Sequence, residues 1–187
     1  SMRGLEIVNH IQQALTLESA SDEKFRESLQ GPVYEDNKAV CRFVLCALEE
    51  SQMTRETRVD LWERKGKQFI WTIEHIFPQG ENIPKFWVDM IADGDAAQAE
   101  IYRQKYVHCL GNLTISGYNS ALGNKSFAEK QNRVDSHNRK VGYNNGLFLN
   151  ESLATEDSWT VDKIAERTEL LVDQVLSKYP LADVGKP

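Results

Sequence analysis

The sequence predicts an α+β fold: a mostly helical domain around a small core of a β-hairpin and a helix. Apolar residues recur every three or four positions in several segments, whereas only stretches within 68–75 and 106–115 have strand character. With 187 residues, 41% of them hydrophobic and 27% charged, the chain can bury the core of one ordinary domain. We expect a single compact unit with helical support over 1–60, a core over 61–135 with a helical insertion over 84–106, and a loop and helix over 136–187.

The first part of the chain has the periodicity of helices. Apolar positions predict an amphipathic helix over 3–17. A usable cap at Ser21 and the acidic Asp22 and Glu23 predict a short helix over 22–30, which ends at Gly31-Pro32. A third helix, over 37–50, has the strongest pattern, and we expect three of its residues in the core: Phe43, Val44 and Leu48.

Near residue 68 the period changes from that of a helix to that of a strand. Aromatic and β-branched residues alternate over 68–75, so we predict a strand that ends at Glu74 and His75. Pro78 follows and stops strand pairing because it has no N–H to donate. The helical insertion comes next, broken at Asp93-Gly94-Asp95.

Two further strand-like pieces, 106–110 and 113–115, flank Gly111-Asn112. A short helix over 119–134 is predicted to turn its apolar residues inward (Ala121, Leu122, Phe127 and Val134) and its basic residues outward (Lys125, Lys130 and Arg133). Residues 136–158 are polar and turn-rich, and a last helix, capped by Thr160 or Ser158, ends at Pro180.

Composition excludes several classes of protein. No apolar run approaches the roughly 20 residues of a membrane-spanning helix. The opening residues resemble no signal peptide, and Ser1 before Met2 resembles a cloning remnant, so we expect a fragment of a longer protein. The cysteines, Cys41, Cys46 and Cys109, form no CxxC pair; we expect them to be buried, in a protein of a reducing compartment.

The net charge of -6 argues against nucleic-acid binding until the chain is divided. Residues 1–60, 61–100 and 146–187 carry -4, -3 and -4, whereas residues 101–145 carry +5. Affinity for phosphates depends on where the cations lie, so this one basic segment keeps DNA open as a partner.

Glu74-His75 carries residue types that phosphodiester hydrolysis needs. A neutral histidine can take a proton from water, and a glutamate is a hard oxygen ligand suited to Mg²⁺ or Mn²⁺. Alone, the pair is more often an ordinary surface pair. Asn112 and Asn119 follow in a hairpin-to-helix context, where asparagine amide oxygens can also bind a cation, although a turn and a helix cap are the simpler interpretations of each.

Taken together, these stretches resemble the HNH (ββα-metal) nuclease family. The resemblance rests on Glu74 to Gln79, on His108 to Thr114, and on Asn119 to Asn124 with Phe127 and Lys130. More narrowly, it is to the C-terminal nuclease domain of GmrSD-type modification-dependent restriction and phage-defence proteins, over about residues 35–180. The chain lacks the zinc-binding cysteine pairs of simple HNH nucleases and has a long insertion between Gln79 and His108.

The resemblance implies roles for individual residues. His75 would be the general base, Glu74 a metal ligand, and Asn112 the middle asparagine that holds the hairpin loop. Asn119, in preference to Asn124, would complete the site for Mg²⁺ or Mn²⁺. His108 would support the site or contact phosphate, unless it is a packed histidine. The candidates for contacts to the DNA backbone are Lys125, Lys130, Arg133, Arg139 and Lys140.

The resemblance also implies a setting: a DNA endonuclease or nickase acting on double-stranded, possibly modified DNA in the bacterial cytoplasm. Its companion would be an N-terminal nucleotide-hydrolysing or sensor domain, absent here because the sequence has no GxxxxGK[ST] and no GxGxxG motif. The alternative is an HNH-like module that binds DNA or protein and no longer cuts. A zinc hydrolase acting on protein is disfavoured because the HExxH motif is missing.

Overall fold

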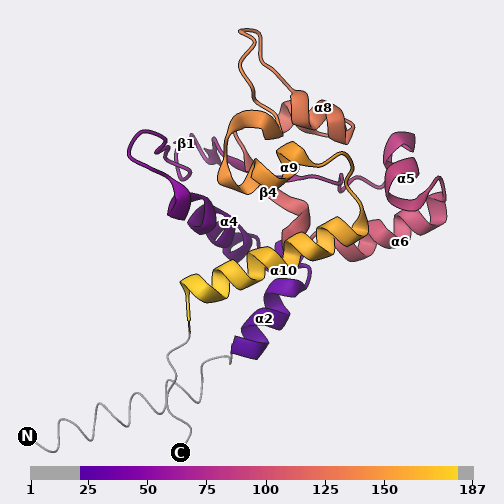
Figure 1. The fold of residues 1–187 in the computed structure, drawn as a ribbon, viewed down its shortest axis with the longest axis horizontal. Coiled ribbons are helices and arrows are strands. Elements are labelled where there is room, and N and C mark those ends of the chain that lie inside the picture. The colour runs from indigo at the N-terminus through magenta and orange to yellow at the C-terminus, as the bar shows by residue number, and fades with distance from the viewer. Residues whose placement is uncertain (1–21, 181–187) are drawn as a thin grey trace, which may run out of the picture.

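A computed structural model describes residues 22–180 (Figure 1). Within them, helices dominate and two separate pairs of short antiparallel strands complete the fold. This confirms the mostly helical α+β class. The helix predicted over 3–17 and the residues Ser1, Met2 and His10 lie outside the described part.

The N-terminal helices are α2 (Asp22–Gln30), α3 (Val33–Asp36) and α4 (Lys38–Gln52). The predicted helices over 22–30 and 37–50 are therefore confirmed. The side chain of Asn37 caps α4 by accepting hydrogen bonds from the N–H groups of Ala39 and Val40. Val44 and Leu48 are buried as predicted, but Phe43 was predicted wrongly: it is 49% exposed, and its ring contacts that of Tyr179 near the end of the last helix.

The strand predicted over 68–75 is two strands in two different sheets. β2 (Gln68–Phe69) pairs with β1 (Arg64–Lys65) in a hairpin, and β3 (Thr72–His75) pairs with β4 (Leu113–Ser116). Alternation of side chains cannot reveal this break, because the apolar pattern continues across it. The predicted strand at 106–110 is also wrong, since the backbone there leaves a helix and enters the 3-10 turn η1 (Leu110–Asn112).

Between β3 and β4 the chain forms the predicted helical insertion, α5 (Lys85–Ala92) and α6 (Ala96–Tyr106). Asp93 has the left-handed φ of 49° and ends α5. Asp95 caps α6 by accepting from the N–H groups of Ala97 and Gln98. The insertion thus lies between two strands that pair with each other in space.

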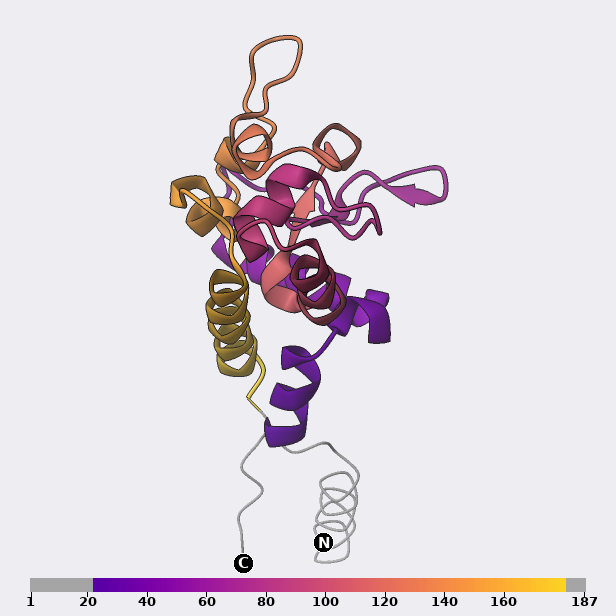
Figure 2. The same ribbon diagram turned by 90° about the vertical axis from the view of Figure 1, so that its right-hand side faces the viewer.

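After β4, the single helix predicted over 119–134 is two short helices, α7 (Asn119–Leu122) and α8 (Phe127–Asn132). Gly123, at φ 39°, separates them, and Ser126 with Glu129 forms a capping box that starts α8. Leu122 and Phe127 are buried as predicted, whereas Val134 is 40% exposed in the loop beyond α8. That loop, closed by a bridge between Val134 and Lys140, projects at the top of Figures 1 and 2.

The C-terminal part wraps the core. Two 3-10 turns, η2 (Tyr143–Asn145) and η3 (Phe148–Asn150), lead into α9 (Glu151–Thr155) and then α10 (Val161–Lys178). Thr160 caps α10 as predicted, by accepting from the N–H of Lys163. In Figure 1, α10 crosses the molecule between α2, α4 and α6. Gly111 of η1 packs so closely on α10 that a Cβ there would lie 2.1 Å from the carbonyl oxygen of Ile164.

Burial confirms one prediction from composition. The cysteines at 41, 46 and 109 are buried free thiols. Within residues 22–180, no helix is long and apolar enough to cross a membrane.

Candidate functional site

The candidate site lies at the end of β3. Antiparallel pairing places Glu74 opposite Thr114 and His75 opposite Leu113. Directly beyond the strand, the N–H of Ile76 donates to the carbonyl of Asn112, 2.9 Å away. The corner that follows Glu74-His75 is therefore held against the start of β4, although 37 residues separate His75 from Asn112 in the sequence.

Glu74 is buried and its carboxylate is paired with a lysine. The Nζ of Lys130 on α8 lies 2.7 Å from Oε1 of Glu74, and both side chains are at most 3% exposed. The same ammonium group donates to the carbonyls of His75 and Ile76, at 2.8 and 3.0 Å. Burial raises the pKa of Glu74 to about 7, and the charge of Lys130 opposes that rise. The lysine thus fixes the backbone of the corner as well as compensating the carboxylate.

This geometry corrects the assignment of Lys130 as an outward residue that contacts DNA. Its side chain has no exposed surface and its ammonium group already has three acceptors. The spacing from Phe127 could have revealed this, because residues three apart share one face of a helix and Phe127 is in the core. A buried cation of this kind needs a partner, and here that partner is Glu74.

His75 faces His108 across the corner. Its Nε2 lies 3.2 Å from Nδ1 of His108, and Tyr34 contacts both rings, edge-on to His75 and stacked on His108. The pKa of His75 is lowered to about 3, mainly by burial and to a smaller extent by the neighbouring charges of His108 and Lys130. The imidazole of His75 is therefore neutral at physiological pH, as a proton acceptor must be.

The tautomer of the histidine pair decides which nitrogen is basic. If Nε2–H of His75 donates to His108, then Nδ1 of His75 carries the free lone pair. His108 then holds the ring of His75 in a fixed orientation. Burial also lowers the pKa of His108, so both rings can be neutral together.

Asn112 is fully buried and all of its side-chain bonding capacity is used structurally. Its Oδ1 accepts from the N–H of Phe77 and from Nε1 of Trp159. Its Nδ2 donates to the carbonyls of Phe77 and Val107. These four bonds tie the segment after β3, the end of α6 and the loop before α10 to one amide group.

Asn119 and Asn124 occupy different positions. Asn119 begins α7, and its Nδ2 donates to the carbonyl of Ile73, 2.7 Å away, whereas its Oδ1 has no donor among residues 22–180. Asn124 is exposed in the loop between α7 and α8, and its side chain makes no hydrogen bond within the described residues. The structure therefore brings Asn119, and not Asn124, onto the strand of Glu74 and His75.

The remaining basic candidates are on the surface. Lys125 lies 3.7 Å from Glu129, and Arg139 pairs with Asp135 at 2.6 Å. Arg133 and Lys140 are exposed on the loop beyond α8. These four side chains are accessible to a phosphate backbone, although two of them share their charge with a carboxylate.

The donor atoms at this corner fit a hydrated Mg²⁺ ion poorly. Mg²⁺ prefers oxygen ligands, and the carboxylate of Glu74 already holds the ammonium group of Lys130 where a cation would bind. Among residues 22–180, no three His, Cys, Asp or Glu side chains gather as a metal-binding group. Glu74 as a metal ligand therefore stays a prediction, against which the buried ion pair weighs.

A second buried cation, noted in the sequence among the apolar positions of the last helix but given no role, supports the start of β4. Arg167 of α10 donates to the carbonyls of Gly111, Leu113 and Leu149 while only 5% exposed. The signal was its place among the apolar positions of the last helix, three residues after buried Ile164.

Comparison with known proteins gives the family. No curated protein and no solved structure matched the chain. The model of the family described as "GmrSD restriction endonucleases, C-terminal domain" matches residues 19–174, which include β3, β4 and every candidate residue of the site. The match confirms the resemblance that the stretches around Glu74-His75 and Asn112 indicated. The chain therefore belongs to the family of C-terminal domains of GmrSD restriction endonucleases.

Proposed function

We propose that this domain hydrolyses phosphodiester bonds of DNA by an HNH-type mechanism in which His75 is the general base. The family supports a role as the effector of a restriction endonuclease, and hence DNA as the substrate. The observation that carries the assignment is the neutral, oriented imidazole of His75 at the end of β3.

In this mechanism His75 takes a proton from a water molecule as the water oxygen attacks phosphorus. The bond between phosphorus and the leaving oxygen breaks, and that oxygen leaves with the electron pair and is protonated. The ring of His75 is only 6% exposed, which keeps bulk water from competing for the basic nitrogen. Lys130 and Asn112 position the corner through the backbone, and neither is needed as a reacting group.

Dependence on Mg²⁺ or Mn²⁺ is part of the proposal, with Asn119 as the amide ligand. What supports it is the resemblance to metal-dependent nucleases together with the unbonded Oδ1 of Asn119. Titrating each metal against plasmid nicking tests it. Asn119→Ala should reduce the response to metal more than Asn124→Ala does, because only Asn119 reaches β3.

The test of the base is His75→Ala in a plasmid-nicking assay with Mg²⁺ or Mn²⁺. Nicking should be lost while the circular dichroism spectrum is retained. His137→Ala is the matched control, because His137 is exposed on the loop beyond α8, away from β3. Nicking by His75→Ala at the wild-type rate would remove His75 as the base.

A second candidate function is supported by the ion pair between Glu74 and Lys130: a domain that binds DNA or a protein without cutting. A buried ammonium group in place of a metal ion is what such a module would have. Calorimetry that detects no metal binding, combined with DNA retention and no nicking, would decide for this function.

The wider setting is proposed on the family alone. We propose that the substrate is double-stranded DNA, modified or unmodified, and that a nucleotide-hydrolysing or sensor domain outside this chain selects it. The setting is defence against phage in the bacterial cytoplasm. Comparing cleavage of modified and unmodified plasmid by the longer protein and by this domain tests the division of labour.

A further inference from the structure

A pocket of about 850 Å³ lies beside the candidate site and has an unusual lining. Its walls come from α3 and α4, from the β1–β2 hairpin, from β3 and from the start of α7. It shares Ile73 and Asn119 with the site described above, and its Tyr34 contacts the rings of His75 and His108. We call it the basic–aromatic pocket.

The charges of this pocket have one sign. Lys38, Arg42 and Arg64 line it, and no aspartate or glutamate does. Among the described residues, neither Lys38 nor Arg64 has a carboxylate within ion-pair distance; each lies instead over an aromatic ring, that of Tyr34 or Phe69. In a chain of net charge -6, three cations without a carboxylate mark a place for an anion.

Arg42 strengthens this interpretation because its buried charge is incompletely satisfied. It is only 7% exposed, and it donates to the carbonyls of Trp71 and Leu61. Its Nε is buried without a hydrogen-bond partner. Buried ionised groups are normally paired with an opposite charge, and no carboxylate pairs with this one within residues 22–180.

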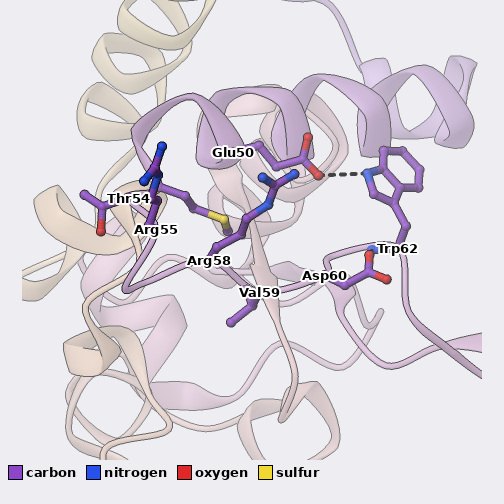
Figure 3. Close-up of a pocket in the computed structure, with 8 residues that line it drawn as sticks. Glu50, Thr54, Arg55, Arg58, Val59, Asp60 and Trp62 are labelled. Carbon is purple, nitrogen blue, oxygen red and sulfur yellow. Dashed lines mark hydrogen bonds between the residues drawn. The ribbon is translucent and has the colours of Figure 1, made fainter.

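The aromatic rings of the pocket are held in place. Trp62 is 40% exposed, and its Nε1 donates to Oε1 of Glu50 at 2.9 Å (Figure 3). Figure 3 shows Glu50 and Trp62 joined at one end of a neighbouring pocket, with Arg55 and Thr54 away from the indole. A ring anchored in this way, beside the edge of Phe69, offers a rigid surface for stacking.

We propose that the basic–aromatic pocket holds one unstacked deoxynucleotide of the DNA strand, with its phosphate at Lys38 and Arg64 and its base against Trp62. Cations that follow the backbone together with aromatic rings that stack on bases are the combination by which proteins hold single-stranded DNA. Bases inside a duplex stack on one another and cannot reach such a ring, so the nucleotide must be unpaired. This inference rests on the proposed function in taking DNA as the ligand, and it adds local strand opening next to His75.

Binding tests the proposal separately from cleavage. The His75→Ala protein in EDTA is titrated with a ten-nucleotide oligothymidylate, with the same strand carrying abasic sites, and with a blunt duplex. Trp62→Ala should weaken binding of the oligothymidylate about tenfold or more, because each base stacked on an aromatic ring contributes on that scale. It should leave binding of the abasic strand and of the duplex unchanged.

Two more variants separate phosphate contacts from general charge. Lys38→Gln with Arg64→Gln should lower the slope of log affinity against log salt by about 0.7 for the single strand, since the two cations neutralise one phosphate and each neutralised phosphate contributes about 0.7. The control, Lys85→Gln with Lys178→Gln, removes the same charge outside this pocket and should not change the slope. Binding should also quench tryptophan fluorescence in the parent protein and less so in Trp62→Phe.

Equal affinity of Trp62→Ala and its parent for the oligothymidylate would overturn the proposal, as would equal weakening of single-strand and duplex binding by the Lys38 and Arg64 changes. The two proposals can fail independently. Binding that depends on Trp62 in a protein that never nicks would refute the nuclease mechanism and keep the pocket. Nicking that depends on His75, in a protein whose DNA binding does not change with Trp62→Ala, would refute the pocket and keep the nuclease mechanism.

Discussion

Replacing Lys130 with methionine is the most informative test of how this site is held together. The change keeps the length of the side chain and removes its charge. It takes away the three hydrogen bonds to Glu74, His75 and Ile76 and leaves the carboxylate of Glu74 buried without a partner. Breaking a buried ion pair from one side typically costs about 3–5 kcal/mol. For a domain of this size, 1 kcal/mol shifts Tm by roughly 2–4 °C, so we expect Tm to fall by about 10 °C.

The loss should depend on pH with a definite sign. In the wild type, burial already raises the pKa of Glu74 to about 7, against the opposing charge of Lys130. Without that charge the folded-state pKa rises further above the value of the unfolded chain. The folded variant then binds a proton that the unfolded chain releases, so its stability is highest in acid and falls as pH rises through the folded-state pKa. The deficit relative to wild type should therefore be larger at pH 8 than at pH 5.

Thermal and urea unfolding, followed by circular dichroism at both pH values, measure this effect. Lys85→Met is the control, because Lys85 is an exposed lysine whose partner, Asp89, is one turn away on the same helix. Glu74→Gln with Lys130→Met should recover part of the loss, since the double variant buries no unpaired charge. A Lys130→Met protein as stable as Lys85→Met at pH 8 would refute the argument that this ion pair supports the corner.

Three further predictions follow from buried groups of the site. Asn112→Ala should lower the free energy of unfolding by about 2–6 kcal/mol, since it strands the buried donors of Phe77 and Trp159 at about 1–3 kcal/mol each; a loss below 1 kcal/mol in urea unfolding would contradict this. Gly111→Ala should destabilise the domain severely, because its Cβ would lie 2.1 Å from the carbonyl of Ile164 and 2.7 Å from the N–H of Thr168; a soluble variant with wild-type Tm would show that η1 can move off α10. The nicking rate should not fall with an ordinary histidine midpoint between pH 7 and 5, because the pKa of His75 is lowered to about 3 and the base stays neutral in that range; a midpoint within that range that persists in the His108→Ala protein would contradict this.

Much of this fold follows from local sequence signals. The strong helices, α4, α5, α6 and α10, were predicted because apolar periodicity is a local property, as is the cap of α10 at Thr160. The end of β3 at Glu74-His75 was predicted for the same reason, since strand-forming residues stop at a proline-containing turn. The resemblance of the motif stretches then identified the family over most of the chain.

The sequence by itself determined which residues form the corner and which helices surround it; only the tertiary structure decided how their charges are distributed. Lys130 was predicted to face solvent, yet it is buried against Glu74; Arg42, for which nothing was predicted, is buried against aromatic rings. The physical reason is that local periodicity depends on neighbours three and four residues away, whereas the partner of a buried charge comes from a distant segment: 56 residues separate Glu74 from Lys130, and 33 separate His75 from His108. Long-range packing therefore decides which polar groups are buried, which pKa values are shifted, and which cations stay exposed to solvent.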